Sequence, residues 1–181
     1  MKKNFFIPMA ALIPLTLFLS AGFAQNQSAE TVFNDKMKVT PPDSVVNQPK
    51  SLNYSTDIGS LSTKIAKNFT RNFKDVDDVR INLIKNYTYI YCKKDGITNR
   101  IRYDKKGNWD YTIRYYQEDQ MPKEIRKQVK INFFDFEIDG VSEVSVGNKT
   151  AYLVTIKSIQ TWKTVKILDD EMSVVGSYQA K

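Results

Sequence analysis

Aspartate, arginine and tyrosine offer the most scope for chemistry in this 181-residue sequence, which has no histidine and a single cysteine. Without histidine, neither a Ser-His-Asp triad nor a Cys-His pair can form, and the usual nitrogen and sulfur ligands of zinc are missing. The seven glycines form no phosphate-binding loop. We therefore expect a non-catalytic protein without metal or cofactor. The alternative is a hydrolase that uses Ser-Lys or carboxylate chemistry.

Two groups of carboxylates are dense enough to consider as sites. Three aspartates lie within residues 75–78, and paired carboxylates can run acid–base chemistry or hold a cation. A solvated turn between a helix and a strand is the favoured interpretation. Asp104, Asn108 and Asp110 loosely resemble a calcium loop but lack its full ligand spacing, so a β-turn is favoured there as well.

The lone cysteine, Cys92, lies in an apolar and aromatic run. This setting favours a packed thiol rather than a nucleophile. No disulfide framework can form with one cysteine, so the domain must be stabilised by its core alone.

The amino terminus has the three parts of a secretory signal peptide in the right order. Lys2 and Lys3 precede an apolar run at residues 5–19, and the small residues Gly22 and Ala24 follow it. We expect cleavage after residue 24 and a periplasmic or secreted protein with no membrane span in its mature form. The alternative, an uncleaved anchor, is disfavoured because the apolar run is shorter than the roughly 20 residues that a spanning helix needs.

Residues 25–59 differ in composition from the rest of the chain. They contain Pro41, Pro42 and Pro49 and show no apolar periodicity, which indicates a flexible lead or linker. An ordered extension that docks through Val45 or Leu52 is the alternative. The folded domain is predicted to span residues 60–181.

The first half of this domain begins with a predicted helix at residues 61–73. Its apolar residues, among them Ile65, Phe69 and Phe73, recur every four positions and share one helical face. Ser60 or Ser62 can cap its start. Alternating patterns then predict four short strands, at residues 79–83, 87–91, 100–103 and 109–115, with turn signals at 93–96 and 105–108.

The second half repeats this order. Met121 and Pro122 open a helix that ends near Phe133, and strand patterns follow at residues 141–146, 151–156, 164–168 and 173–178. The helices match at an offset of 60 residues and the aromatic strand matches at 65, so one five-residue insertion reconciles them.

The predicted fold class is therefore α+β. We expect two tandem α-β-β-β-β repeats, residues 60–118 and 119–181, with one antiparallel sheet and both helices packed on one of its faces.

Three segments, "NYTYIYCKKDG", "IRYDKKGNWDYTIRYY" and "MPKEIRKQV", carry a family resemblance. The chain from about residue 61 to its end resembles the PepSY-like family of exported bacterial domains, which is similar in fold to the β-lactamase-inhibitor proteins. The second repeat departs from the pattern, with Asp170, Glu171 and Met172 where a glycine turn is usual. The resemblance implies a location and a fold rather than an activity. Binding to a β-lactamase is not carried over, because no inhibitory loop residues match.

The charge of the chain bears on its partner. It carries 27 Lys and Arg against 20 Asp and Glu, and loss of Lys2 and Lys3 with the signal peptide leaves it mildly basic. A basic protein favours an acidic protein or an anionic polymer. Nucleic acid is not expected, because the sequence has no motif for it and the protein is exported.

Alternation also predicts which side chains face away from the helices. Tyr87, Tyr89 and Tyr91 are expected in the core, with a ligand-stacking platform as the alternative. The outward set then includes Thr88, Ile90 and Thr112 and the candidate binding residues Arg80, Arg100, Arg102, Arg114, Tyr116, Lys157 and Lys166.

The outward set is basic and contains an interleaved aromatic residue. Arginine and aromatic side chains are favoured at recognition surfaces. We therefore hypothesise a binding module whose open sheet face binds an acidic exported protein or an anionic envelope polymer. A solvated face that deters aggregation is the alternative for the surface, and a structural envelope protein is the alternative for the chain.

Overall fold

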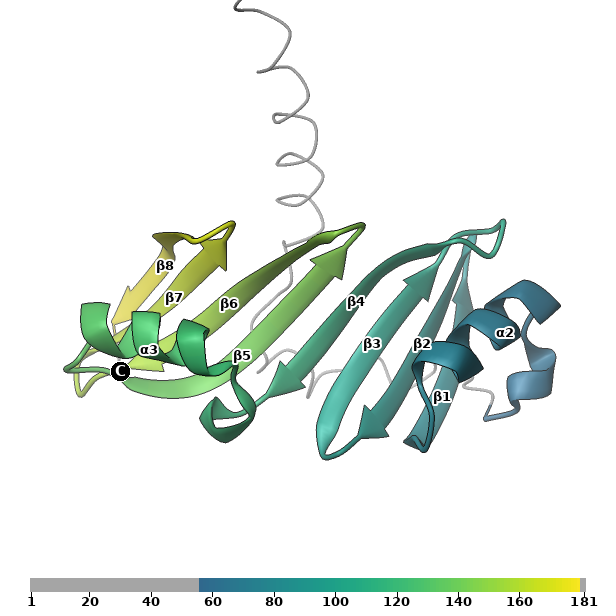
Figure 1. The fold of residues 1–181 in the computed structure, drawn as a ribbon, viewed down its shortest axis with the longest axis horizontal. Coiled ribbons are helices and arrows are strands. Elements are labelled where there is room, and N and C mark those ends of the chain that lie inside the picture. The colour runs from purple at the N-terminus through teal and green to yellow at the C-terminus, as the bar shows by residue number, and fades with distance from the viewer. Residues whose placement is uncertain (1–55, 180–181) are drawn as a thin grey trace, which may run out of the picture. The chain divides into compact units, whose positions relative to one another are not determined.

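The structure, a computed structural model, describes residues 56–179, which form an α+β domain around one antiparallel sheet (Figure 1). Eight strands lie in the sheet in chain order, and each pairs antiparallel with the next. They are β1 (Asp77–Ile84), β2 (Tyr87–Lys94), β3 (Ile97–Tyr103), β4 (Trp109–Tyr116), β5 (Glu137–Val146), β6 (Lys149–Lys157), β7 (Thr161–Leu168) and β8 (Glu171–Gln179).

Two α-helices accompany the sheet: α2 (Thr63–Asn72) precedes β1, and α3 (Lys123–Asn132) lies between β4 and β5. Single turns of 3₁₀ helix, Ile58–Ser60 and Glu118–Gln120, precede them. No helix within residues 56–179 is long and apolar enough to cross a membrane. The predicted signal peptide and nearly all of the predicted lead lie outside the described residues.

Helix α2 begins and ends where its sequence provides the required hydrogen bonds. Ser62 is the N-cap, and its hydroxyl accepts a hydrogen bond from the amide of Ile65. At the other end the amide of Phe73 donates to the carbonyl of Phe69. Asp75 then adopts a positive φ of 52°, so the chain leaves the helical path before β1.

Each helix packs against its own group of strands. Ile65 and Phe69 of α2 belong to one core cluster with residues of β1–β3: Ile81, Ile90, Cys92, Ile101 and Tyr103. Val129 of α3 belongs to a second cluster with residues of β4–β7: Tyr116, Ile138, Val141, Val154, Ile156, Val165 and Ile167. The burial of these apolar side chains is the main source of stability for each half of the sheet.

Strand pairing determines which side chains share a face of the sheet, because directly paired residues point to the same side. Ile90 of β2 pairs with Ile81 and Ile101. This row continues through Thr112 of β4 to Ser145 of β5. The row therefore joins the core under α2 to the second half of the sheet.

Val141 lies in the same strand as Ser145, an even number of residues away, and so points to the same side. It packs in the core cluster that includes Val129 of α3. Figure 1 shows both helices on the side of the sheet that faces the viewer. We call this side the helix face and the opposite side the outer face.

The tyrosines of β2 lie on the outer face, so their predicted place in the core is wrong. Ile90 and Cys92 of the same strand are buried in the core cluster under α2. Alternation then directs Tyr87, Tyr89 and Tyr91 away from that helix. Since β2 carries large side chains on both faces, alternation by itself cannot tell which set is inside.

The β7–β8 turn is formed without glycine. Asp169 and Asp170 have φ values of 50° and 64°, a left-handed pair that tight hairpin turns require and that glycine adopts most easily. Asp169 is also paired with Lys149, whose Nζ lies 2.6 Å from its Oδ2. Within the described residues, the side chain of Asp170 forms no corresponding ion pair to support its positive φ.

Replacing Asp170 with glycine should stabilise the protein. We expect Asp170→Gly to raise the free energy of unfolding by about 0.5–1 kcal/mol, because glycine has no Cβ to oppose a positive φ. Chemical denaturation of wild type and variant measures this change. Asp170→Ala is the control, and a glycine variant no more stable than the alanine variant would contradict the explanation.

Candidate functional site

Tyrosines and arginines form an ordered array on the outer face over β2–β4. The Cζ atom of Arg102 lies 4.6 Å from the ring centre of Tyr87 and 4.3 Å from that of Tyr111. The Cζ atom of Arg100 lies 5.2 Å from the ring centre of Tyr89 and 5.8 Å from that of Tyr91. Each guanidinium is therefore within cation–π distance of two rings. We call these six residues the Tyr–Arg array.

A β-bulge brings a carboxylate to this array. The pairing of β3 with β4 shifts between Arg102 and Tyr103, which leaves Asp110 as an extra residue in β4. The Nε atom of Arg102 donates to Oδ2 of Asp110 over 2.7 Å. The charge of Arg102 is therefore balanced locally, and its side chain is held in place by both rings and the ion pair.

Arg100 differs from Arg102 because it forms no ion pair with a carboxylate among residues 56–179. Its Nε atom is buried without a hydrogen-bond partner in this part of the chain. Burial lowers the pKa of Arg100, but the surrounding tyrosines, with Tyr91 first, outweigh it and raise the pKa overall. The guanidinium therefore stays charged and is the cation of the array with unused donor capacity.

The other predicted binding residues of the outer face do not belong to the Tyr–Arg array. Arg80 pairs with Tyr91 in the sheet and forms an ion pair with Asp78 at 2.8 Å. Lys157 forms an ion pair with Asp139 at 2.9 Å. Lys166 pairs with Leu153, on the opposite side from the buried neighbours within β7. Carboxylates therefore balance the charges of two of these predicted binding residues, Arg80 and Lys157.

Arg114 and Tyr116 lie on the helix face, which corrects their predicted place among the outward residues. Arg114 pairs with Asn99 and Glu143, while Tyr116 belongs to the core cluster that contains Val141. Thr88, Ile90 and Thr112 also point to the helix face. The physical reason is that β4 has large side chains on both faces, including the buried Ile113 on the outer face.

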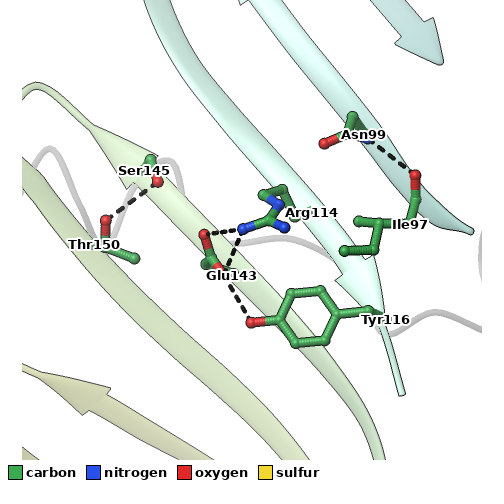
Figure 2. Close-up of polar contacts among 7 residues, drawn as sticks. All are labelled: Ile97, Asn99, Arg114, Tyr116, Glu143, Ser145 and Thr150. Atoms are coloured by element: carbon green, nitrogen blue, oxygen red, sulfur yellow. Dashed lines mark hydrogen bonds and ion pairs between the residues drawn. The ribbon is translucent and has the colours of Figure 1, made fainter. Parts of the chain in front are cut away.

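Arg114, Tyr116 and Glu143 form a polar cluster that joins the two halves of the sheet (Figure 2). The Nη1 atom of Arg114 donates to Oε1 of Glu143 over 3.0 Å and to Oε2 over 3.2 Å. The hydroxyl of Tyr116 donates to Oε2 over 2.7 Å. Because β4 and β5 meet here, the cluster ties the first four strands to the last four.

Comparisons with known proteins bear on the fold. No protein-family model and no curated protein matches the chain. A solved BLIP-like protein, that is, one resembling the β-lactamase-inhibitor protein, from Bacteroides fragilis is similar at 15% identity and a TM-score of 0.52, over 70% of this chain and 92% of that one. This chain has a BLIP-like fold.

Two further solved structures are similar to this chain. One is a DUF2874 family protein from Bacteroides ovatus, at 10% identity and a TM-score of 0.51 over 66% of this chain and 88% of that one. The other is a candidate periplasmic protein from Bacteroides eggerthii, at 11% identity and a TM-score of 0.50 over 67% and 90%. At these identities the likeness is one of fold.

The two acidic groups singled out in the sequence have structural roles. Asp78, with φ 53°, holds Arg80 through both of its oxygens. Asp104 accepts hydrogen bonds from the amides of Lys106 and Asn108 at 2.8 Å each, and these contacts lower its pKa, the Asn108 amide most of all. Within the described residues, no group of three His, Cys, Asp or Glu side chains could hold a metal ion.

Two buried ionisable groups lie in the core cluster under α2. Burial raises the pKa of the Cys92 thiol to about 11 and is the main reason that the pKa of Tyr103 rises to about 12. The thiolate is the nucleophilic form of cysteine, so Cys92 is unreactive at neutral pH. This agrees with its predicted role as a packed thiol.

The protein should lose stability at alkaline pH. When a group has a raised pKa in the folded state, the unfolded chain loses that proton first as pH rises. The group's contribution to the free energy of unfolding is therefore complete below its unfolded pKa and is lost as pH rises towards its folded pKa. For Cys92 the loss falls between about pH 9 and 11, and for Tyr103 between about pH 10 and 12. Denaturation midpoints across this range measure it. Tyr103→Phe should flatten the fall above pH 10, and an unchanged slope would contradict the assignment.

Proposed function

We propose that this chain is an exported, non-catalytic binding module that recognises an acidic protein through the Tyr–Arg array. The proposal includes its origin in the PepSY-like family and an architecture of two tandem α-β-β-β-β repeats with both helices on one face. The observation that carries it is the position of Arg100, a charged guanidinium within cation–π distance of Tyr89 and Tyr91 and with no carboxylate partner in the described residues.

The composition of the array supports a protein partner. Tyrosine and arginine are enriched at the centres of protein interfaces, because they provide large contact areas and directional hydrogen bonds. A free arginine loses side-chain entropy when it is fixed in a complex. In the unbound protein, Arg100 and Arg102 each already lie within cation–π distance of two rings, which restricts their side chains, so less entropy is lost when a partner binds.

The charge of Arg100 supports an acidic partner. A guanidinium offers a planar fork of donors that a carboxylate can accept in pairs. Arg102 is already satisfied by Asp110, and Arg80 by Asp78. Arg100 is therefore the residue that binds an acidic side chain of the partner. The other cations contribute a weaker, general electrostatic attraction.

Photocrosslinking from the outer face tests this proposal. A photoreactive phenylalanine analogue replaces Tyr87, whose side chain is 39% exposed, in the mature protein exported by cells. Mass spectrometry then identifies the crosslinked species. The matched control carries the analogue at Lys127, which is exposed on α3. We expect an acidic protein to crosslink from position 87 and not from position 127.

Charge reversal provides the second arm of the test. Arg100→Glu should abolish the crosslink at position 87, whereas Lys127→Glu, with the same change in charge, should leave it intact. Equal crosslinking by both folded variants would refute a role for Arg100. Recovery of an anionic polymer in place of a protein would favour the alternative partner.

A further inference from the structure

A recess on the helix side of the first half, separate from the Tyr–Arg array, has a volume of about 380 Å³. One wall is formed by α2, through Lys64, Lys67, Asn68 and Arg71, and the other by the β3–β4 turn and the start of β4. Lys67 and Asn68 each lie three or four positions from Lys64 and from Arg71, so the four residues line one face of the helix. Neighbouring side chains on this face form one continuous wall of the recess.

The turn is held firmly against the helix. Gly107 has a φ of +73°, and a Cβ at this position would lie 3.3 Å from side-chain atoms of Lys64 and Ile65. Asp104 accepts hydrogen bonds from both the backbone and the side chain of Asn108. The oxygen of the Asn108 amide is thereby presented to Nζ of Lys64 at 2.5 Å. The wall opposite α2 is therefore preformed.

Positive charge dominates the recess. Lys64, Lys67 and Arg71 line it, and no carboxylate does. Among residues 56–179, none of these three side chains forms an ion pair. Asp104 lies close enough for Lys64 to contribute to its lowered pKa, but its oxygens are used within the turn. An anion placed here would meet three cations, two of which make no hydrogen bond within the described chain.

Two further lining residues can recognise a ring that carries the anion. Trp109 is half-buried and is held in place because its Nε1 donates to Oγ1 of Thr112 over 2.9 Å. The oxygen of the Asn68 side chain accepts a hydrogen bond from Tyr103 at 2.8 Å, so its NH₂ group is the part left for a ligand. An indole beside fixed amide groups suits the apolar and hydroxyl surfaces of a sugar ring.

We propose that this recess binds a sugar that carries a single oxyanion, either a sulfate or a phosphate ester. Lys67 and Arg71 bind the oxyanion by charge-assisted hydrogen bonds, Lys64 adds electrostatic attraction, and Trp109 packs against the ring. The volume is at the small end of the range of ligand sites, about 300–1,000 Å³, so the ligand is a small sugar unit rather than a folded partner.

Tryptophan fluorescence can report this binding directly. The chain has two tryptophans, Trp109 and Trp162, so a Trp162→Phe background leaves Trp109 as the reporter. Mature protein is titrated with glucose 6-sulfate, glucose 6-phosphate, glucose and inorganic phosphate. The site variant is Lys67→Ala/Arg71→Ala. The matched control, Lys123→Ala/Lys127→Ala, removes the same charge from exposed positions of α3.

A saturable fluorescence change with either sugar ester, at a dissociation constant of about 1 mM or tighter, is the expected result. The site variant should bind at least about tenfold more weakly, as expected for the loss of charge-assisted contacts, and the control variant should bind like wild type. No saturation with either ester, or equal weakening in both variants, would overturn the proposal. Inorganic phosphate that binds as tightly as the esters would overturn the assignment of a sugar ring.

Discussion

Truncation of Phe69 is expected to be among the most damaging single changes to this protein. The side chain is 1% exposed, lies in the core cluster between α2 and β1–β3, and stacks on Phe73 with ring centres 5.4 Å apart. Phe69→Ala removes most of this buried surface and leaves a cavity. Such changes cost about 3–5 kcal/mol in the free energy of unfolding.

Chemical denaturation of three variants tests this prediction. Phe134→Ala is the matched control, because Phe134 is 85% exposed and its loss should change stability by less than about 0.5 kcal/mol. Val129→Ala, the corresponding truncation under α3, should also destabilise, by less than Phe69→Ala because fewer atoms are lost. A Phe69→Ala midpoint like that of Phe134→Ala would show that α2 does not pack as described.

Removal of Glu143 is expected to have the second largest effect. Its side chain is 10% exposed, and it accepts hydrogen bonds from Arg114 and from the hydroxyl of Tyr116. Glu143→Ala leaves the buried hydroxyl without an acceptor and the guanidinium without its counter-charge. We expect a loss of about 2–3 kcal/mol, below the cost of breaking a fully buried pair because the Arg114 side chain is 40% exposed.

A double-mutant cycle separates this cluster from general packing. If the contact between Glu143 and Tyr116 stabilises the fold, the effects of Glu143→Ala and Tyr116→Phe on the free energy of unfolding will not be additive. We expect a coupling energy of at least about 0.5 kcal/mol. Glu171→Ala removes an exposed carboxylate from β8 and is the control. Additive effects, or a Glu143→Ala loss no larger than that of the control, would contradict a role in joining β4 to β5.

The Tyr–Arg array and the recess beside α2 lie on different sides of the sheet, so their tests are independent. Arg100→Glu alters the outer face, whereas Lys67→Ala/Arg71→Ala alters residues of α2. Loss of the protein crosslink with unchanged sugar binding would separate the two activities. Loss of sugar binding with an unchanged protein crosslink would also separate the two activities.

Local patterns in the sequence predicted the type and order of the α-helices and strands, although β5 begins at Glu137 and β7 at Thr161, four and three residues before their predicted starts. The four-residue spacing of Ile65, Phe69 and Phe73 placed α2 to within two residues at its start and one at its end. Asp95 and Gly96 form the β2–β3 turn with the positive φ values that their types favour. These features depend on residues close in the chain, so alternation, capping and turn preferences predict them.

The buried side of a strand can be predicted from the sequence only where one of its two faces is polar. In β3, Ile101 and Tyr103 are buried, and they alternate with Arg100 and Arg102, which were predicted to point outward. In β2 and β4, both faces carry apolar or aromatic side chains, so a period of two describes either orientation equally well. The docking of α2 on Ile90 and Cys92 breaks this symmetry and directs the tyrosines outward.

The two candidate sites likewise depend on contacts between distant residues. Lys64 and Asn108 are 44 residues apart in the chain, and Arg114 and Glu143 are 29 apart. The residue types, the elements that carry them and the absence of histidine chemistry follow directly from the amino-acid sequence. Pairing of β4 with β5 and packing of α2 against the β3–β4 turn brought those residues together, because burial and hydrogen bonding across the whole fold select one register and one face.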